Sequence, residues 1–234
     1  MSDDKVTWSS DAELFELAKR DLFTSVVGDA ADKLGFLKQY LPPEIKALDT
    51  RSVMIGRAMT VLEADVYEQQ STGRMDPVSG KPFGLMLEAL DDLKENEVYI
   101  CTGSSPRYAL WGELMSLRAT HLKAAGAVLD GYLRDANGIE AQGFPAFAYG
   151  SYGQDQGPRG KVIDYRVPIE IGGVHIAPGD IVFGDRDGVL VIPQNAEREI
   201  FEAAFEKARG EKTVDDAIRN GMGAVEAMET FGIL

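Results

Sequence analysis

The amino-acid sequence predicts an α/β fold, and three observations lead to this prediction. Residues 97–129 read as strand, helix and strand in succession, an order typical of parallel sheets. Residues 144–192 contain short hydrophobic runs separated by turns rich in glycine, proline and aspartate, which indicates further strands. Both ends of the chain show the spacing of apolar residues that helices have. We therefore expect a sheet with helices packed against it and extra helices at both termini.

The composition restricts the class of protein. Of 234 residues, 44% are hydrophobic and 26% are charged, which is ordinary for a soluble globular protein. The length fits one large domain or two small ones. The 38 Asp and Glu residues exceed the 24 Lys and Arg residues, so the net charge is -14. Such a surface repels phosphate backbones, so we expect no nucleic-acid ligand; an enzyme, or a partner of a basic protein segment, fits better.

The sequence favours the cytoplasm. Residues 1–5 are polar and lack the apolar stretch of a signal peptide. No segment approaches the ~20 apolar residues of a membrane span, so we expect no membrane association. The single cysteine, Cys101, lies in an apolar run, cannot form an internal disulfide, and is interpreted as a buried hydrophobic residue.

Helices and strands alternate along the first half of the chain. Ser10, with Glu13 three residues later, predicts the start of a helix, and Thr24 or Ser25 is expected to cap a second helix that Gly35 ends. The expected helices are 11–20, 26–34, 85–93 and 112–125. The expected strands are 51–63, read as paired strands broken at Gly56, then 97–102 and 127–129. Residues 69–82 are rich in Gly, Pro and Ser and are expected to form a flexible loop without a domain boundary.

The second half is expected to be mostly strands followed by two helices. Gly172-Gly173 lies between two alternating runs and predicts a hairpin turn. The expected strands are 144–149, 162–171, 174–176, 181–183 and 189–192, and the expected helices are 196–208 and 214–228. We expect a single domain over residues 1–234, with a C-terminal helical extension from about residue 196.

Several common catalytic motifs are absent. The chain has no Gly-Lys-Ser/Thr phosphate loop, no Gly-x-Gly-x-x-Gly after a strand and no Gly-x-Ser-x-Gly. His121 and His175 stand far apart in sequence, lack the spacing of metal ligands and are interpreted as structural.

Candidate groups for binding a substrate and a metal lie in residues 111–115 and 125–135. Gly112 begins a helix whose free N–H groups can hold a carboxylate. Arg134 offers a fixed fork of donors for a carboxylate or enolate oxygen. Asp135 is a hard oxygen ligand suited to Mg²⁺ or Mn²⁺. The alternative is that Arg134 and Asp135 form only a surface turn.

These residues and several others resemble the RraA-like family, which includes 4-hydroxy-4-methyl-2-oxoglutarate aldolases and the regulator of ribonuclease E activity A. The most specific mark is an acidic residue, twenty intervening residues and then Arg-Asp, here Glu113 to Arg134-Asp135. Further matches follow in the same order along most of the chain: Thr24, Asp29-Ala30, Gly35, Gly143-Phe144-Pro145, Val167-Pro168, Ile171-Gly172-Gly173-Val174, Pro178-Gly179-Asp180 and Gly184-Asp185-x-Asp187-Gly188-Val189.

The resemblance implies a β/β/α swivelling-domain-like fold and a role for each site residue. Asp135 would orient a divalent metal, Mg²⁺ or Mn²⁺, largely through waters. Arg134 would bind the 2-oxo acid and stabilise the enolate, and Glu113, where the aldolases usually carry Asp, would polarise the water that protonates it. Gly112 and the backbone amides of Leu114 and Met115 would receive the substrate carboxylate. No Schiff-base lysine is implied.

The implied activity is that of a class II pyruvate aldolase, a metal-dependent lyase that cleaves 4-hydroxy-2-oxo acids to pyruvate and also decarboxylates oxaloacetate. One alternative is a regulator of ribonuclease E-type complexes that acts through protein contacts. Another is a metal-dependent lyase or hydratase acting on sugar-acid derivatives. The resemblance also implies a homotrimer or a dimer of trimers, in which Glu211, expected after a C-terminal helix, reaches a neighbour's metal.

The chain departs from the aldolases' pattern at two positions. Those enzymes carry an acidic residue three positions after the metal-orienting Asp, whereas this chain has Gly138. Glu113 is one methylene longer than Asp. Both departures leave the substrate beyond a 2-oxo acid open.

Overall fold

The computed structural model describes residues 6–67 and 80–232. It consists of two compact units: the first comprises Met1–Leu37 and Asn195–Leu234, and the second comprises Lys38–Gln194. The single domain expected over the whole chain stays a prediction. Most of the loop expected at 69–82 lies outside the described residues. Within the described ranges, no helix is long and apolar enough to cross a bilayer.

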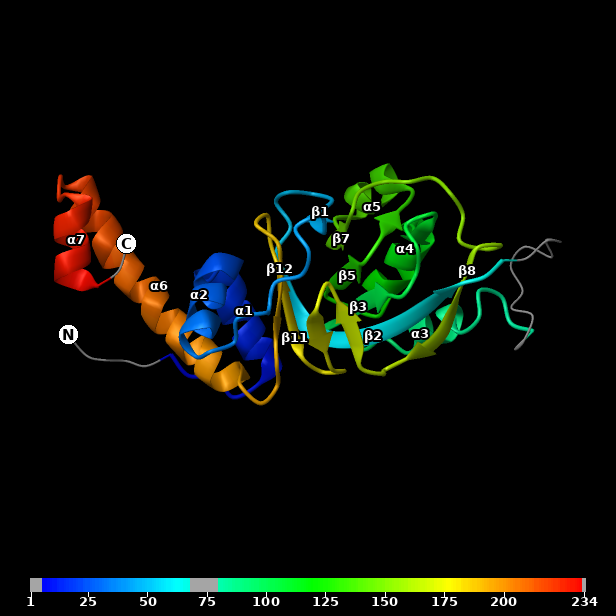
Figure 1. The fold of residues 1–234 in the computed structure, drawn as a ribbon, viewed down its shortest axis with the longest axis horizontal. Helices are drawn as coiled ribbons and strands as arrows, with labels where there is room; N and C mark the ends of the chain where they lie inside the picture. Colours follow the sequence, from blue (N-terminus) through cyan, green and yellow to red (C-terminus); the bar gives the residue numbers. More distant parts are fainter. Residues whose placement is uncertain (1–5, 68–79, 233–234) are drawn as a thin grey trace. The chain divides into compact units, whose positions relative to one another are not determined.

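The first unit contains the helices from both chain ends, α1 (Asp11–Asp21), α2 (Thr24–Lys33), α6 (Glu197–Arg219) and α7 (Ala224–Phe231) (Figure 1). The extra terminal helices are thus confirmed. Helix α1 begins as predicted, because Ser10 Oγ accepts a hydrogen bond from the Glu13 N–H at 3.3 Å. The predicted cap of α2 was wrong: Phe23 occupies the N-cap position without a side-chain hydrogen bond, and Thr24 and Ser25 lie inside the helix.

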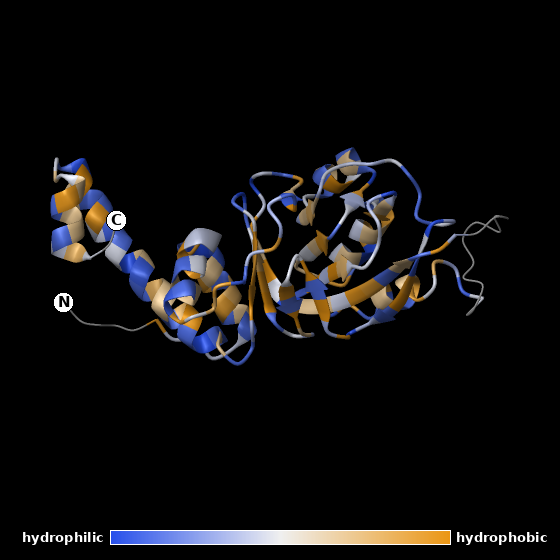
Figure 2. Ribbon diagram, viewed as in Figure 1, coloured by the Kyte–Doolittle hydropathy of each residue, from blue (hydrophilic) through white to orange (hydrophobic). Residues whose placement is uncertain are grey.

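Helix α6 is one continuous helix of 23 residues, where the sequence suggested a break after residue 208. Its apolar face continues across the expected break, since both Ala208 and Val214 are buried, and Figure 2 shows orange and blue residues alternating along its length. A pair one turn apart also joins Lys207 Nζ to Glu211 Oε1 at 2.6 Å. Glu211 therefore lies within the helix, not after its end as predicted.

The second unit is built on a mixed sheet. Strands β7 (Ala146–Ala148), β5 (Gly126–Leu129), β3 (Glu97–Thr102) and β2 (Met54–Asp65) run parallel to one another in that order. Antiparallel neighbours extend it: β1 (Lys46–Ala47) beside β7, and β8 (Gly160–Tyr165), β11 (Ile181–Gly184) and β12 (Val189–Ile192) on the side of β2. The parallel packing expected from the strand–helix–strand order is confirmed.

Alternating side chains of this sheet enter two separate cores. Tyr99 and Cys101 pack with residues of α3 (Met86–Asp91), α4 (Glu113–His121) and α5 (Ala136–Gln142). Val98 and Ile100 pack on the opposite face with the hairpin of β9 (Ile169–Ile171) and β10 (Val174–Ile176). The layers are thus hairpin, sheet and helices, which confirms the predicted mixed α/β class. Cys101 is buried as predicted, and burial raises the pKa of its thiol.

Local geometry at two glycine positions determines where a strand continues and where it turns. The predicted break at Gly56 was wrong, because β2 runs through this residue. A Cβ at position 56 would lie 2.4 Å from the Asn96 carbonyl oxygen, so glycine allows the backbone at Asn96 to approach the strand closely. The predicted hairpin turn is confirmed, since Gly172 and Gly173 both have positive φ, 57° and 83°, as a type I′ turn requires. The expected strand 162–171 is divided into β8 and β9, and Arg166 between them has φ 54°.

Candidate active site

A small parallel sheet brings the two halves of the predicted site together. Strand β4 (Ala109–Trp111) pairs with β6 (Tyr132–Leu133), so that Trp111 lies opposite Leu133. The Arg134 N–H donates to the Trp111 carbonyl at 2.9 Å. As a result, the residues that follow β4 lie beside those that follow β6. Neither short strand was predicted, although both contain residues of the segment that the sequence analysis singled out, 111–115 and 125–135.

Asp135 is held in an unusual backbone conformation. It has φ 59° and ψ 36°, in the left-handed region, and it is the N-cap residue of α5. A residue other than glycine in this region costs about 1–3 kcal/mol, and such strain is frequent at functional sites. The Asp135 Oδ2 accepts a hydrogen bond from the Glu113 N–H at 3.4 Å. The carboxylate thus lies over the first turn of α4, where the site was expected.

Arg134 lies between two carboxylates. Its Nη1 is 2.8 Å from Asp155 Oδ1, and its Nε is 3.7 Å from Asp135 Oδ2. Asp155 was missed by the sequence analysis; it lies in a loop, where its Oδ2 also accepts the Gly157 N–H at 3.1 Å. All three side chains are one third to one half exposed, with 38%, 33% and 48% for Arg134, Asp155 and Asp135. Because such pairs contribute ~0–1 kcal/mol, Arg134 can exchange Asp155 for a bound anion.

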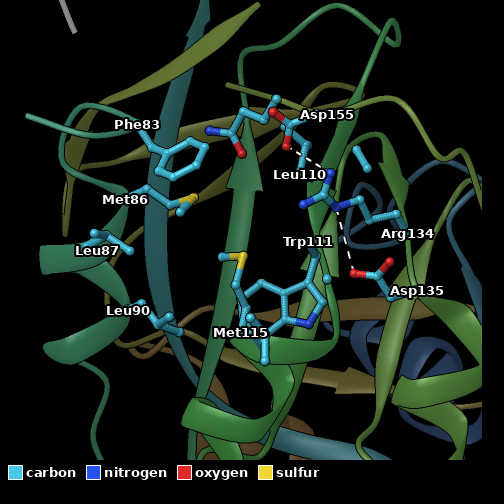
Figure 3. Close-up of a pocket in the computed structure, with 14 residues that line it drawn as sticks. Phe83, Met86, Leu87, Leu90, Leu110, Trp111, Met115, Arg134, Asp135 and Asp155 are labelled. Carbon is cyan, nitrogen blue, oxygen red and sulfur yellow. Dashed lines mark hydrogen bonds and ion pairs between the residues drawn. The ribbon is translucent and has the colours of Figure 1, made fainter. Parts of the chain in front are cut away.

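These charged groups form one wall of a pocket of about 390 Å³ (Figure 3). The size is that of a small-molecule site. Trp111 and Met115 line the pocket between this wall and an apolar wall that belongs to α3 and the residue Phe83 before it. Gly112 and Leu114 also line it. Five of the six predicted site residues therefore line one cavity: Gly112, Leu114, Met115, Arg134 and Asp135. Glu113 is not among its lining residues.

The first turn of α4 faces this pocket. Gly112 is the N-cap residue, and the Ser116 N–H bonds back to the Gly112 carbonyl at 3.1 Å. The amides of Leu114 and Met115 precede this bond, and at these positions a helix offers no internal acceptor. A helix start with free N–H groups favours a carboxylate.

Comparison with known proteins identifies the fold and the family. The profile of the RraA-like family, described as Aldolase/RraA, matches residues 24–191. The chain belongs to the RraA-like family. A protein of Halalkalibacterium halodurans named "Putative 4-hydroxy-4-methyl-2-oxoglutarate aldolase" is 31% identical over 210 residues, which cover 89% of this chain and 90% of that protein.

Solved structures agree with this assignment. Streptomyces coelicolor RraAS2, described as an unusual member of the RNase ES inhibitor RraA protein family, superposes with a TM-score of 0.75 at 25% identity and covers 90% of this chain and 100% of its own. A structure described as one of novel cellulases from microbes associated with the gut ecosystem has a TM-score of 0.78 at 30% identity, with 90% of both chains covered. The RraA-like fold expected from the resemblance is confirmed.

The two departures from the aldolase pattern meet in space in this RraA-like chain. The Glu113 side chain extends toward α5, and a Cβ added to Gly138 would lie 2.3 Å from the Glu113 carboxyl carbon. The longer acid at position 113 thus occupies the space that a side chain at position 138 would need. The exposed Glu113 carboxylate is therefore held beside α5, and its predicted catalytic role stays a prediction.

The residues present fit a divalent cation that keeps most of its waters. Among the residues that the structure describes, no group of three or more His, Cys, Asp or Glu is arranged to hold a metal. Mg²⁺ usually binds through one or two carboxylates, several waters and the substrate, so a full set of protein ligands is not needed. Asp135 has the required hard oxygen, is half-exposed and lies at the pocket.

A second group of ionisable residues is buried behind the pocket. Glu63 and Lys161 are 2% and 1% exposed on the adjacent strands β2 and β8. Burial raises the pKa of Glu63 to about 8, although the charge of Lys161 acts in the opposite direction. Lys161 Nζ donates to the Gly157 carbonyl. The Tyr108 hydroxyl donates to Asp65 at 3.0 Å. The sequence analysis did not single out this cluster.

Proposed function

We propose that this RraA-like protein is a divalent-metal-dependent lyase that cleaves a 4-hydroxy-2-oxo acid and releases pyruvate. The observation that carries the proposal is the position of Arg134, held between Asp135 and Asp155 at a pocket that also contains the first turn of α4. The relatives named as aldolases support the same reaction class. Oxaloacetate decarboxylation is a side activity, because it passes through the same enolate.

Different groups at the pocket bind the carboxylate and the 2-oxo oxygen of the substrate. The substrate carboxylate accepts hydrogen bonds from the amides of Leu114 and Met115 in the first turn of α4. Arg134 leaves Asp155 and donates to the 2-oxo oxygen. Its interaction strengthens as negative charge develops there during cleavage, so it favours the transition state over the bound substrate.

Two acidic residues complete the chemistry. Asp135 would hold the metal, which supplies Lewis-acid polarisation of the 2-oxo group when bound. Glu113 would polarise a water that takes up the 4-hydroxyl proton as the C3–C4 bond breaks. The same water would then deliver a proton to the methylene carbon of the enolate, and this step yields pyruvate. The role of Asp135 is assigned from its carboxylate and its place at the pocket, and that of Glu113 from its carboxylate and its position in the first turn of α4.

The proposal is tested by measuring pyruvate release from a panel of 2-oxo acids with and without Mg²⁺. We expect a chelator to abolish release and Mg²⁺ or Mn²⁺ to restore it. Full activity in excess chelator contradicts metal dependence. No pyruvate from any 4-hydroxy-2-oxo acid or from oxaloacetate contradicts the lyase.

We further propose that the protein acts as a trimer or a dimer of trimers, with Glu211 of a neighbouring subunit near the metal. Light scattering at micromolar concentration is expected to give a trimer or hexamer. A fully active monomer contradicts a shared site.

A further inference from the structure

The pocket has two walls of different chemistry. The charged groups Arg134, Asp135 and Asp155 line one wall. The opposite wall is entirely apolar and consists of Phe83, Met86, Leu87 and Leu90 (Figure 3). A small molecule that fills the pocket therefore has one end among charges and the other end among hydrocarbon side chains.

The described residues leave part of the apolar wall exposed. Leu87 is 43% exposed and Leu114, at the neighbouring start of α4, is 79% exposed, whereas Met86 and Leu90 are buried. Exposed apolar area at a concave site favours an apolar ligand, because its burial removes hydrocarbon surface from water. Met86 and Met115 add side chains that adapt to different ligand shapes.

Two described cations close to α3 are already paired. Lys81 Nζ is 2.6 Å from Glu88, and Arg118 Nε is 2.8 Å from Asp91. Among the described residues that line the pocket, Arg134 is the cation. If Arg134 binds the carboxylate and 2-oxo end of a substrate, a second carboxylate at the far end would lie against the apolar wall without a cationic partner. Burial of an unpaired carboxylate is strongly unfavourable.

We propose that the substrate of this site is a 2-oxo acid whose distal half is an aliphatic or aryl group and not a second carboxylate. The inference rests on the proposed function for the end that Arg134 binds. The other end of the substrate contacts the apolar wall, which is formed by Phe83, Met86, Leu87 and Leu90. The wall thereby selects among 2-oxo acids that share the same reactive carbons.

Binding of two non-cleavable probes separates this inference from the lyase. In the presence of Mg²⁺, calorimetry is expected to show that 4-methyl-2-oxopentanoate binds the whole protein at least about 10-fold more tightly than 2-oxoglutarate, a ratio typical of a well-fitted apolar group. Tighter or equal binding of 2-oxoglutarate overturns the inference, whatever the cleavage assay shows. Preference for the apolar probe without any pyruvate release supports the inference and overturns the lyase. If neither probe binds, both are overturned.

A charge placed on the apolar wall tests the assignment of the wall itself. Leu87→Arg is expected to raise affinity for 2-oxoglutarate and lower it for 4-methyl-2-oxopentanoate, with a combined change in the ratio of about 10-fold or more. Leu87 is partly exposed, so the fold tolerates the substitution. Leu117→Arg is the matched control, because Leu117 is an exposed leucine of α4 that does not line the pocket. An unchanged ratio in Leu87→Arg, or an equal change in Leu117→Arg, overturns the inference.

Discussion

The second unit contains two clusters of acidic and basic side chains, one exposed at the pocket and one buried. In the pocket cluster, Arg134, Asp135 and Asp155 are all at least one third exposed. In the buried cluster, Glu63 and Lys161 are almost inaccessible to water. The loop between β7 and β8 contributes to both, since Asp155 lines the pocket and the Gly157 carbonyl accepts a hydrogen bond from Lys161. Exposure separates a site that can exchange partners from one that is fixed.

The difference has an energetic basis. An exposed ion pair contributes ~0–1 kcal/mol, so a substrate can replace one partner at little expense. A buried charge has lost its hydration, and removal of its partner typically costs ~3–5 kcal/mol. Substitutions in the pocket cluster should therefore change turnover with little change in folding, and substitutions in the buried cluster should do the reverse.

The largest expected effect on stability comes from Lys161→Met. The change removes a buried ammonium group that donates to the Gly157 carbonyl and favours the charged form of Glu63. At pH 9, where Glu63 is ionised, we therefore expect the free energy of unfolding to fall by ~3–5 kcal/mol in urea denaturation. Lys94→Met is the control, because Lys94 pairs with Asp92 on the surface, and its effect should stay below ~1 kcal/mol. Equal losses in both variants would show that burial does not distinguish the clusters.

Arg134→Ala is expected to have the largest effect on turnover. Loss of a donor that acts on developing charge typically lowers kcat by ~100- to 1000-fold, and Arg134→Lys should not restore it, because lysine lacks the planar fork. The melting temperature should stay near that of the parent. Arg118→Ala removes an exposed arginine of α4 outside the pocket and serves as control. Turnover with oxaloacetate within a few-fold of the parent would remove Arg134 from the site.

Asp135→Asn and Glu113→Gln are expected to separate metal binding from proton transfer. Asparagine also tolerates the left-handed backbone, so Asp135→Asn should fold and chiefly weaken Mg²⁺ affinity, by ~10- to 100-fold in calorimetry. Glu113→Gln should slow turnover and leave Mg²⁺ affinity nearly intact. The assignment fails if the two variants lose metal affinity to the same extent.

Gly138→Ala tests the contact between α4 and α5 with a smaller change. The new Cβ displaces the Glu113 carboxylate, which is a flexible exposed group, so stability should change by less than ~1 kcal/mol. If Glu113 acts in the reaction, turnover should fall about 10-fold. Gly153→Ala, at a position with nothing within 4 Å of the added Cβ, should leave turnover unchanged. Parental turnover in Gly138→Ala would argue against a role for Glu113.

The raised pKa of Glu63 also predicts a pH dependence of stability. The pKa of Glu63 is raised in the folded protein to about 8 from 4.5, so the folded state binds more protons between these values. Stability contributed by this group is therefore present at low pH and declines as the pH rises toward 8. The charge of Lys161 and the hydrogen bond from Tyr108 lower the pKa of Glu63, and the charge of Asp65 raises it. These three groups therefore affect the pH at which the stability is lost. Urea denaturation at several pH values should show a shallower slope for Glu63→Gln than for the parent.

The sequence could predict what depends on local patterns. The strand at residues 97–102 and the turn at Gly172-Gly173 were predicted correctly, because hydrophobic patterns and turn chemistry act over a few residues. Strands β4 and β6 and helix α5 were missed, since elements of two to seven residues form through their partners. Asp155 was missed for the same reason: its role arises from an ion pair with Arg134, twenty-one positions earlier, and no spacing rule marks it.

The chain ends have a consequence for the order of events during synthesis. The pocket unit is continuous in sequence, whereas the helical unit combines residues 1–37 with residues 195–234. Within the helical unit, Asp29 of α2 pairs with Lys207 of α6 at 3.2 Å, and Trp8 packs on Phe201. A ribosome therefore releases α1 and α2 long before their partner helix exists. Residues 38–194 can fold as they emerge, and the nascent helices α1 and α2 keep their apolar faces uncovered until α6 leaves the exit tunnel.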